Sequence, residues 1–158
     1  MSFLIIFLLL IGLLFATAFF TKRRFGVLGL ALAAGAMLST LWVGDLTPII
    51  AKAGIEIIKP PLGSLVAAGL ILSPALVLLF SGPTYKTMRQ RIVGATAFAI
   101  LATSLLLEPL GSALVIEGVG KTVYDFFVQY HTSIITAALV LAVLDLLVTK
   151  TPRHHKEH

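Results

Sequence analysis

Cysteine is absent from this chain, and charged residues are scarce. Without cysteine, its 158 residues cannot form disulfides, thiolate metal sites or a cysteine nucleophile. Only 12% of the residues are charged, against roughly 25% in soluble domains, whereas 58% are hydrophobic. Because a soluble domain of this size could not bury so much apolar surface, lipid must solvate most of the chain. The sequence therefore predicts an all-α, polytopic integral membrane protein.

Five apolar stretches are predicted to cross the bilayer as transmembrane helices. They span residues 2–20, 25–44, 62–80, 92–107 and 133–148. A transmembrane helix needs about 20 mostly apolar residues, so the fourth stretch is short. Pro74 interrupts the third stretch, but the hydroxyl of Ser73 can bond the carbonyl that the proline frees. This predicts a kink in that span and not a break.

The first stretch shares one feature with a cleaved signal peptide. Ala16-Thr17-Ala18 has the small-residue pattern of a cleavage site. No basic residue precedes the apolar run, however, and Phe19 and Phe20 continue it beyond that site. We therefore expect a retained span.

Two amphipathic helices are predicted on the outer face of the membrane. The first covers residues 48–59, between a predicted break at Asp45-Leu46-Thr47-Pro48 and the stop signal Pro60-Pro61. The second covers residues 112–130 and carries a charged stripe with a spacing of four residues on an otherwise apolar helix. The stripe consists of Glu117, Lys121 and Asp125. A helix of this kind lies at a membrane surface or packs on other spans with one wet edge.

The basic residues indicate the orientation of the chain. The formal net charge is +5, but the basic residues form short clusters beside apolar runs and do not form a nucleic-acid-binding face. The clusters follow the first, third and fifth spans, within residues 22–24, 86–91 and 150–156. The positive-inside rule then predicts an N-terminus outside and a C-terminus in the cytoplasm.

The order of elements suggests an internal duplication within a single membrane domain, residues 1–158. Residues 25–80 and 92–149 each contain a span, an acidic residue near a proline, an amphipathic helix and a second span. Both units begin on the cytoplasmic side, so the repeats would be parallel. The alternative is a coincidence between two ordinary helical hairpins.

Two predicted spans carry rows of small residues, which let helix backbones approach closely in lipid. The rows are Ala31, Gly35 and Ser39 in the second span, and Ala95, Ala99 and Thr103 in the fourth. They predict helix contacts without identifying the partner helix.

Two acidic residues are candidates for a functional role within or beside the spans. Asp145 lies about one turn from the cytoplasmic end of the fifth span, where a carboxylate is costly unless it finds a partner. We interpret it as an ion-pair partner of a nearby basic residue (Lys150, Arg23, Arg24, Arg89 or Arg91), with a proton or ion relay as the alternative. Glu108 precedes Pro109 at an outer boundary, where it either caps or is solvated, or belongs to a gate or outer vestibule.

Two further motifs carry no specific chemistry. Gly118-Val119-Gly120-Lys121-Thr122 resembles the end of a phosphate-binding loop, but the glycine required at position 115 is a valine and no strand precedes it. We therefore expect no nucleotide. His154, His155 and His158 are interpreted as part of a basic terminus, so no metal and no cofactor are expected.

The chain resembles a known family in the order of its first elements. Arg23-Arg24-Phe25-Gly26 leads into a small-residue span, and a basic cluster leads to Arg91-Ile92-Val93-Gly94 at the start of the fourth. This order is similar to the CvpA-like family of small bacterial inner-membrane proteins, linked to colicin V production and envelope integrity. The similarity covers residues 3–107, with alanines in place of the family's usual fourth-span glycines and a fifth span beyond its usual four. It implies a bacterial cytoplasmic (inner) membrane, and it carries over no site residues.

The sequence favours a non-enzymatic membrane scaffold or accessory subunit, self-associating or bound to other membrane proteins, with the lipid bilayer as its constant partner. The alternative is a small oligomeric channel or transporter subunit with an outer vestibule. An intramembrane enzyme ranks third, because the outer acids Glu108, Glu117 and Asp125 have no His or Ser at a telling spacing. The candidate functional residues are Asp145, Glu108, Glu117, Lys121 and Asp125.

Overall fold

Five α-helices make up most of the chain that the structure describes. The computed structural model describes residues 2–54, 60–81, 83–113 and 119–148. The helices are α1 (Ser2–Thr21), α2 (Phe25–Lys52), α3 (Leu62–Phe80), α4 (Met88–Ala113) and α5 (Val119–Val148). Outside the helices, an isolated bridge pairs Arg23 with Thr84. The predicted all-α fold is confirmed.

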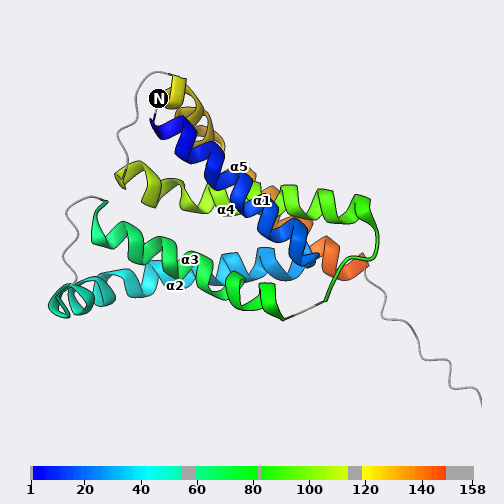
Figure 1. Ribbon diagram of the computed structural model, residues 1–158, viewed down its shortest axis with the longest axis horizontal. Coiled ribbons are helices and arrows are strands. Elements are labelled where there is room, and N and C mark those ends of the chain that lie inside the picture. Colours follow the sequence, from blue (N-terminus) through cyan, green and yellow to red (C-terminus); the bar gives the residue numbers. More distant parts are fainter. Residues whose placement is uncertain (1, 55–59, 82, 114–118, 149–158) are drawn as a thin grey trace, which may run out of the picture.

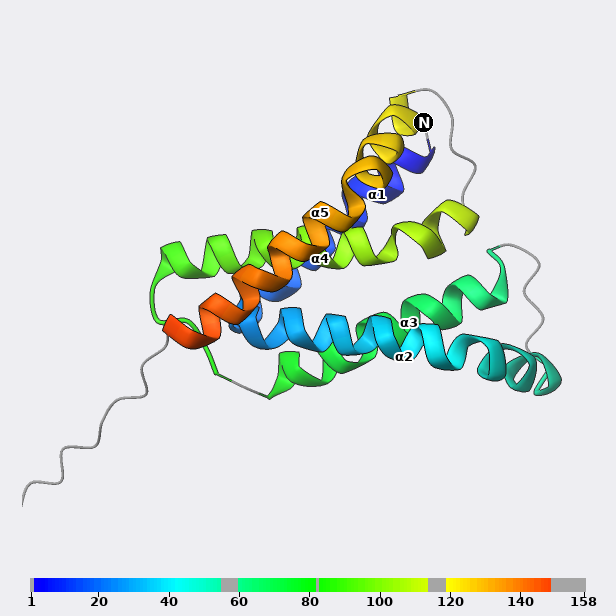
Figure 2. The ribbon, with the colours of Figure 1, turned by 180° about the vertical axis from the view of Figure 1, so that it is seen from behind.

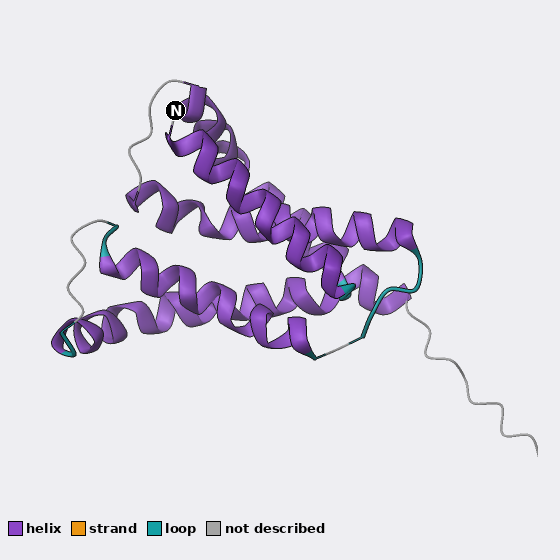
Figure 3. Ribbon diagram, viewed as in Figure 1, coloured by secondary structure: helices purple, strands orange, loops and turns teal. Residues whose placement is uncertain are grey.

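The helices form two groups that meet along α4 and α5. α2 and α3 make a hairpin, and α1 and α5 pack against α4. α4 contacts both helices of the hairpin, and α5 packs along α2 (Figures 1 and 2). α1 and α5 cross α4 obliquely, so that the N-terminal halves of α1 and α5 lean away from the hairpin (Figure 1, and in the same view coloured by secondary structure in Figure 3). The bundle therefore has its tightest convergence near the α1–α2 and α3–α4 turns.

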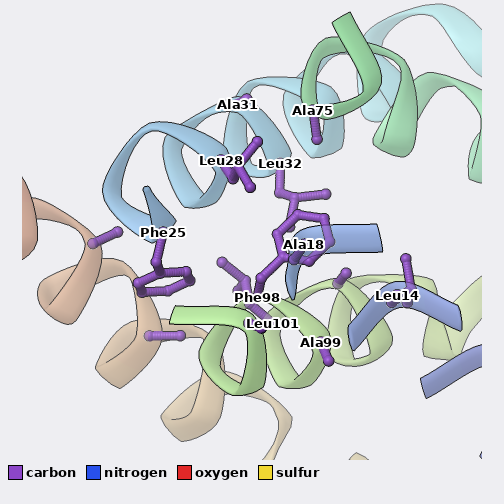
Figure 4. Packing of buried hydrophobic residues seen from close by; sticks show 14 of the residues in the cluster. Leu14, Ala18, Phe25, Leu28, Ala31, Leu32, Ala75, Phe98, Ala99 and Leu101 are labelled. Carbon is purple, nitrogen blue, oxygen red and sulfur yellow. The ribbon is translucent and has the colours of Figure 1, made fainter. Parts of the chain in front are cut away.

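The apolar core is centred on α4. Phe98 and Leu101 of α4 are at most 1% exposed, and they share one buried cluster with Leu28 and Leu32 of α2. Leu14 and Ala18 of α1 belong to the same cluster, which Figure 4 shows from close by. A larger share of α4 is buried than of α2, α3 or α5, because its neighbours cover it.

The outer surface of the bundle is apolar. α2, α3, α4 and α5 each have the length and composition to cross a membrane, whereas the apolar stretch Ile5–Thr21 of α1 is shorter. Every helix also exposes large apolar side chains, including Leu9, Leu41, Val77, Val93 and Leu147, each at least 66% exposed. Water would solvate such a surface poorly, so lipid is its natural solvent.

The predicted break at Asp45–Pro48 is wrong. α2 continues through Pro48 to Lys52, so residues 48–52 are the end of a span-forming helix and not the start of the separate helix predicted at residues 48–59. Thr47 Oγ1 donates to Val43 O at 2.7 Å, beside the Gly44 carbonyl that loses its partner to proline. The chain then turns at Gly54, whose φ of 87° suits glycine. Residues 55–59 lie outside the described residues.

The prediction of a separate amphipathic helix at residues 112–130 is also wrong. α4 runs through Pro109 to Ala113, and residues 119–130 are the first turns of α5, which continues to Val148. No glycine or proline occurs between Lys121 and Val148, so nothing in this segment breaks the helix where the fifth span was expected to begin. Residues 114–118, including Glu117, lie outside the described residues.

The prediction that Pro74 does not break its span is confirmed, whereas the predicted kink stays a prediction. α3 continues through Pro74, and Ser73 Oγ donates to Leu70 O at 3.1 Å. Leu70 is four residues before Pro74, so its carbonyl is the one that the proline leaves without an amide partner. The serine therefore stabilises the helix at its weakest point.

The small-residue row of α2 packs against α3. A Cβ atom on Gly35 would collide with the backbone oxygen of Ile71, and it would lie 2.8 Å from Leu70 O. In α4, the second row (Ala95, Ala99 and Thr103) is at most 3% exposed. Both rows are thus used for packing inside this bundle.

The proposed duplication stays a prediction. The units at residues 25–80 and 92–149 do correspond to two helical hairpins, α2–α3 and α4–α5. In each hairpin the first helix carries a proline four residues before its last residue, Pro48 in α2 and Pro109 in α4.

Candidate functional site

Two of the basic clusters meet at one end of the bundle, which we call the basic end (residues 22–24 and 83–91). The Arg24 N–H donates to Pro83 O at 3.2 Å, and the Tyr85 N–H donates to Lys22 O at 2.8 Å. Lys22 adopts a φ of 58°, which turns the chain sharply between α1 and α2. The structure therefore places the first two clusters together, as the topology prediction requires.

Two arginines of the basic end cap the C-termini of helices. Arg23 donates from Nε to Leu79 O at 2.9 Å and from Nη2 to Phe80 O at 2.8 Å, at the end of α3. Arg91 donates to Phe19 O at 2.9 Å near the end of α1, and its guanidinium lies 4.6 Å from the centre of the Phe19 ring. Cations at helix C-termini satisfy the last carbonyls and oppose the helix dipole. These arginines therefore hold helix ends in place, in addition to their part in the topology prediction.

Asp145 and Tyr85 cap the N-terminus of α2. Asp145 Oδ2 accepts a hydrogen bond from the Gly26 N–H at 3.0 Å, and the Tyr85 hydroxyl accepts one from the Phe25 N–H, also at 3.0 Å. The Tyr85 hydroxyl is also hydrogen-bonded to Asp145, and burial, with a smaller contribution from Asp145, raises the pKa of Tyr85 to about 12. A carboxylate at a helix N-terminus is favoured by the exposed N–H groups and the dipole.

Two glycines make this cap sterically feasible. A Cβ atom on Gly26 would lie 2.6 Å from Ala142 O and 3.0 Å from Asp145 Oδ2. A Cβ atom on Gly94 would lie 2.5 Å from the Tyr85 ring. The sequence pointed to basic partners for Asp145 and missed this cap, because α5 reaches the start of α2 only in the folded bundle.

The other end of the bundle contains an open pocket between the α2–α3 hairpin and helices α4 and α5. Its volume is about 600 Å³, within the range of small-molecule sites. Most of its lining residues are small, and the set comprises Ala36, Ser39, Thr40, Val43, Gly44, Gly63, Ser64, Ala67, Ile71, Leu105, Glu108, Pro109 and His131. Because the topology prediction places this end of the bundle outside, we call this the outer pocket.

The outer pocket combines apolar walls with a few polar groups. Glu108 is exposed and His131 is partly exposed, and both line it together with the hydroxyls of Ser39 and Thr40. The space exists because many of the lining side chains are small. A Cβ atom on Gly44, for example, would meet nothing within 4 Å. The alternative prediction that Glu108 belongs to an outer vestibule agrees with this position.

His131 lines the pocket but was not among the candidate functional residues predicted from the sequence. Its place in the pocket follows from α5 being a single helix that crosses α4. One signal could have indicated the pocket: small and hydroxyl residues recur at steps of one, three and four near the ends of α2 and α3 that line it, at Ser39, Thr40 and Gly44 and at Gly63, Ser64 and Ala67.

The first turns of α5, residues 119–130, form an extension that we call the outer arm. Phe127 packs edge-on against Phe7 of α1 with ring centroids 5.4 Å apart, and Val123 and Tyr124 pack on the cluster of Phe7 and Leu107. On the arm's exposed side lie the two described members of the charged stripe, Lys121 and Asp125, and two aromatic side chains, Phe126 and Tyr130.

These features together define an all-α protein with four helices suited to crossing a membrane and two distinct polar regions at its ends. Among the described residues, no three His, Cys, Asp or Glu side chains gather as metal ligands would. No protein-family model, no curated protein and no solved structure matches the chain.

Proposed function

We propose that the protein is a non-enzymatic scaffold or accessory subunit of a bacterial cytoplasmic membrane. In this proposal its N-terminus is outside, its C-terminus is in the cytoplasm, and its partner is another membrane protein or a second copy. The similarity to the CvpA-like family supports an envelope-related role. The outer arm carries the proposal.

The outer arm is suited to contact a partner because it is long and supported from behind. α5 has 30 residues, which correspond to about 45 Å at 1.5 Å per residue, against about 30 Å for the hydrocarbon core. Its packing against Phe7 and Leu107 holds the arm in place, so the exposed Phe126 and Tyr130 need no ordering before binding. Lys121 and Asp125 beside them would give such a contact polar specificity.

The small-residue rows give little support to self-association. Gly35 packs on α3, and Ala95 and Ala99 are buried in α4. A partner must therefore use a surface other than these rows, and the outer arm offers one.

Site-specific photo-crosslinking tests this proposal in intact bacterial membranes. A benzophenone amino acid replaces Phe126 or Tyr130, and in matched control chains it replaces Val140 or Leu141, which are each 54% exposed further along the same helix. We expect the arm positions to form a discrete protein adduct, either a dimer of the 16.9-kDa chain or one defined partner. Equal protein adducts from all four positions, or none from the arm, would contradict the proposal.

The outer pocket favours a second candidate, a small oligomeric channel or transporter subunit whose vestibule is this pocket. Its polar lining, including Glu108 and His131, is what a solute-facing surface requires. Purified protein in liposomes separates the two candidates. A scaffold leaves a preloaded dye or ion gradient intact, whereas a channel dissipates it, and Glu108→Gln should alter the rate or selectivity of the loss.

A further inference from the structure

The outer pocket has the polarity pattern of a site for an amphiphile. Ile71 and Leu105 supply apolar walls, whereas Glu108 and His131 supply ionisable groups. A ligand with one polar end and an apolar body would match both kinds of wall. This feature concerns what the pocket holds, and it does not depend on whether the protein is a scaffold or a channel.

Ser39 adds a hydroxyl group to the lining of the pocket. Ser39 lines the pocket and is only 9% exposed. Its neighbour Thr40 donates to Met37 O at 2.8 Å, whereas Ser39 Oγ is not one of the fully enclosed, unsatisfied side-chain atoms of the described residues, which are Arg91 Nε and Thr103 Oγ1. The Ser39 hydroxyl therefore faces the pocket as an accessible group that can accept from or donate to a polar atom of a bound molecule.

The charge in the pocket determines which sign of charge a ligand should carry. Among the lining residues, Glu108 is the acidic one and none is lysine or arginine. A carboxylate next to low-dielectric walls attracts a cation and repels an anion. Hydroxyl oxygens such as that of Ser39 can accept from N–H donors, as the Glu108 carboxylate can.

We propose that the outer pocket binds an alkylammonium group, that is, a positively charged amine carried on an apolar body. The ammonium lies between Glu108 and the Ser39 hydroxyl, and the apolar body packs against Ile71 and Leu105. Such a molecule could be the head and upper chain of an aminophospholipid or a soluble amphipathic amine.

Three adamantane derivatives test the charge requirement with a constant apolar body. Adamantan-1-amine is cationic, adamantan-1-ol is neutral, and adamantane-1-carboxylate is anionic. The full chain is embedded in nanodiscs of phosphatidylglycerol, and saturable binding is measured against empty nanodiscs by calorimetry and by the rise in melting temperature that a bound ligand causes. We expect the amine to bind at least tenfold more tightly than the alcohol, and the carboxylate not to bind saturably.

Two variants with matched controls locate the binding. Glu108→Gln should weaken amine binding by about tenfold to a hundredfold, as expected for the loss of a charge-assisted contact, while Glu108→Asp retains most of it. Gly44→Leu should abolish binding by filling the pocket. Gly69→Leu is its control, because a Cβ atom at Gly69 also meets nothing within 4 Å but Gly69 does not line the pocket.

Repeating the measurement in nanodiscs of a second lipid composition shows whether the natural ligand is a lipid or a soluble amine. If an aminophospholipid occupies the pocket, adding phosphatidylethanolamine to the nanodiscs should raise the apparent dissociation constant of adamantan-1-amine by competition. If a soluble amine is the ligand, the added lipid should leave it unchanged. Binding that is absent, that is equal for the amine and the alcohol, or that survives both Glu108→Gln and Gly44→Leu would overturn the proposal.

Discussion

Replacing Gly35 with alanine should destabilise the bundle, although alanine normally favours a helix. Gly35 lies at a close approach between the backbones of α2 and α3. The added Cβ would collide with the backbone oxygen of Ile71 and lie 2.8 Å from both Ile71 C and Leu70 O. These are backbone atoms of a helix, so no side-chain rotation can relieve the contact. The two helices would have to separate until the new methyl group reached an ordinary contact distance of about 3.5–4.0 Å.

The size of the effect follows from two opposing terms. Overpacking of a well-packed site costs about 1–3 kcal/mol, whereas exchanging glycine for alanine in a helix gains up to about 1 kcal/mol. Because this collision is with backbone atoms, we expect a cost in the upper part of that range, about 2–3 kcal/mol, and hence a net loss of about 1–2 kcal/mol for Gly35→Ala. In Gly44→Ala, where a Cβ meets nothing within 4 Å, only the favourable term remains.

Thermal unfolding in one detergent, followed by far-ultraviolet circular dichroism, measures the difference between these two variants. The two terms put them about 2–3 kcal/mol apart, which corresponds to roughly 5–10 °C in Tm for a chain of this size. Gly69→Ala provides a second open-site control on α3. If Gly35→Ala were as stable as Gly44→Ala, the close approach of α2 and α3 would be refuted, and the small-residue row would be available for contact between molecules.

Three further predictions concern the basic end and the orientation of the chain. Because the pKa of Tyr85 rises from 10 to about 12 in the folded state, its contribution is fully present below pH 10 and is lost between pH 10 and 12. A chemical-denaturation series over this range should show about 2–3 kcal/mol of pH-dependent loss that Tyr85→Phe removes. Asp145→Ala should lower unfolding stability by about 1–2 kcal/mol, and Asp145→Asn by less, since an amide oxygen can still accept from the Gly26 N–H; equal losses would show that the cap needs the charge. Single cysteines can be introduced at Lys121 and Lys86 because the chain has none of its own. A membrane-impermeant maleimide should label the cysteine at position 121 from outside the cell and the cysteine at position 86 only from the cytoplasmic side. The reverse pattern would show that the topology is inverted.

The apolar pattern predicted where helices exist better than where they end. Hydropathy and the basic clusters located all five helices, because a run of apolar residues needs lipid or a core whatever its neighbours are. The helix ends were misjudged at Pro48 and Pro109, since a proline near the C-terminus of a helix removes one hydrogen bond there without forcing the helix to stop. Ser73 was interpreted correctly because its partner, Leu70 O, is local in the sequence.

The polar contacts were harder to predict because they join residues far apart in the chain. Asp145 is 119 residues from Gly26, and Tyr85 is 60 residues from Phe25. Their pairing depends on the order in which the helices pack, which a single sequence does not specify. The same holds for the outer pocket, where Glu108 and His131 come together only because α5 crosses α4. The sequence identified Asp145 and Glu108 as unusual, and the fold determined what surrounds them.

The distribution of these contacts implies that the two ends of the bundle differ in how strongly their helices are held together. At the basic end, Arg23, Arg91 and the pair formed by Asp145 and Tyr85 each join one helix terminus to another element. Breaking any of them would expose a helix terminus or a charged group, so this end resists separation of the helices. At the opposite end, short side chains leave a pocket of about 600 Å³ between the hairpin and α4. Any change in the width of that pocket that preserved the caps would have to pivot about the basic end. The residues of the basic end, which the topology prediction places in the cytoplasm, would then be the fixed point against which the pocket end of the bundle opens or closes.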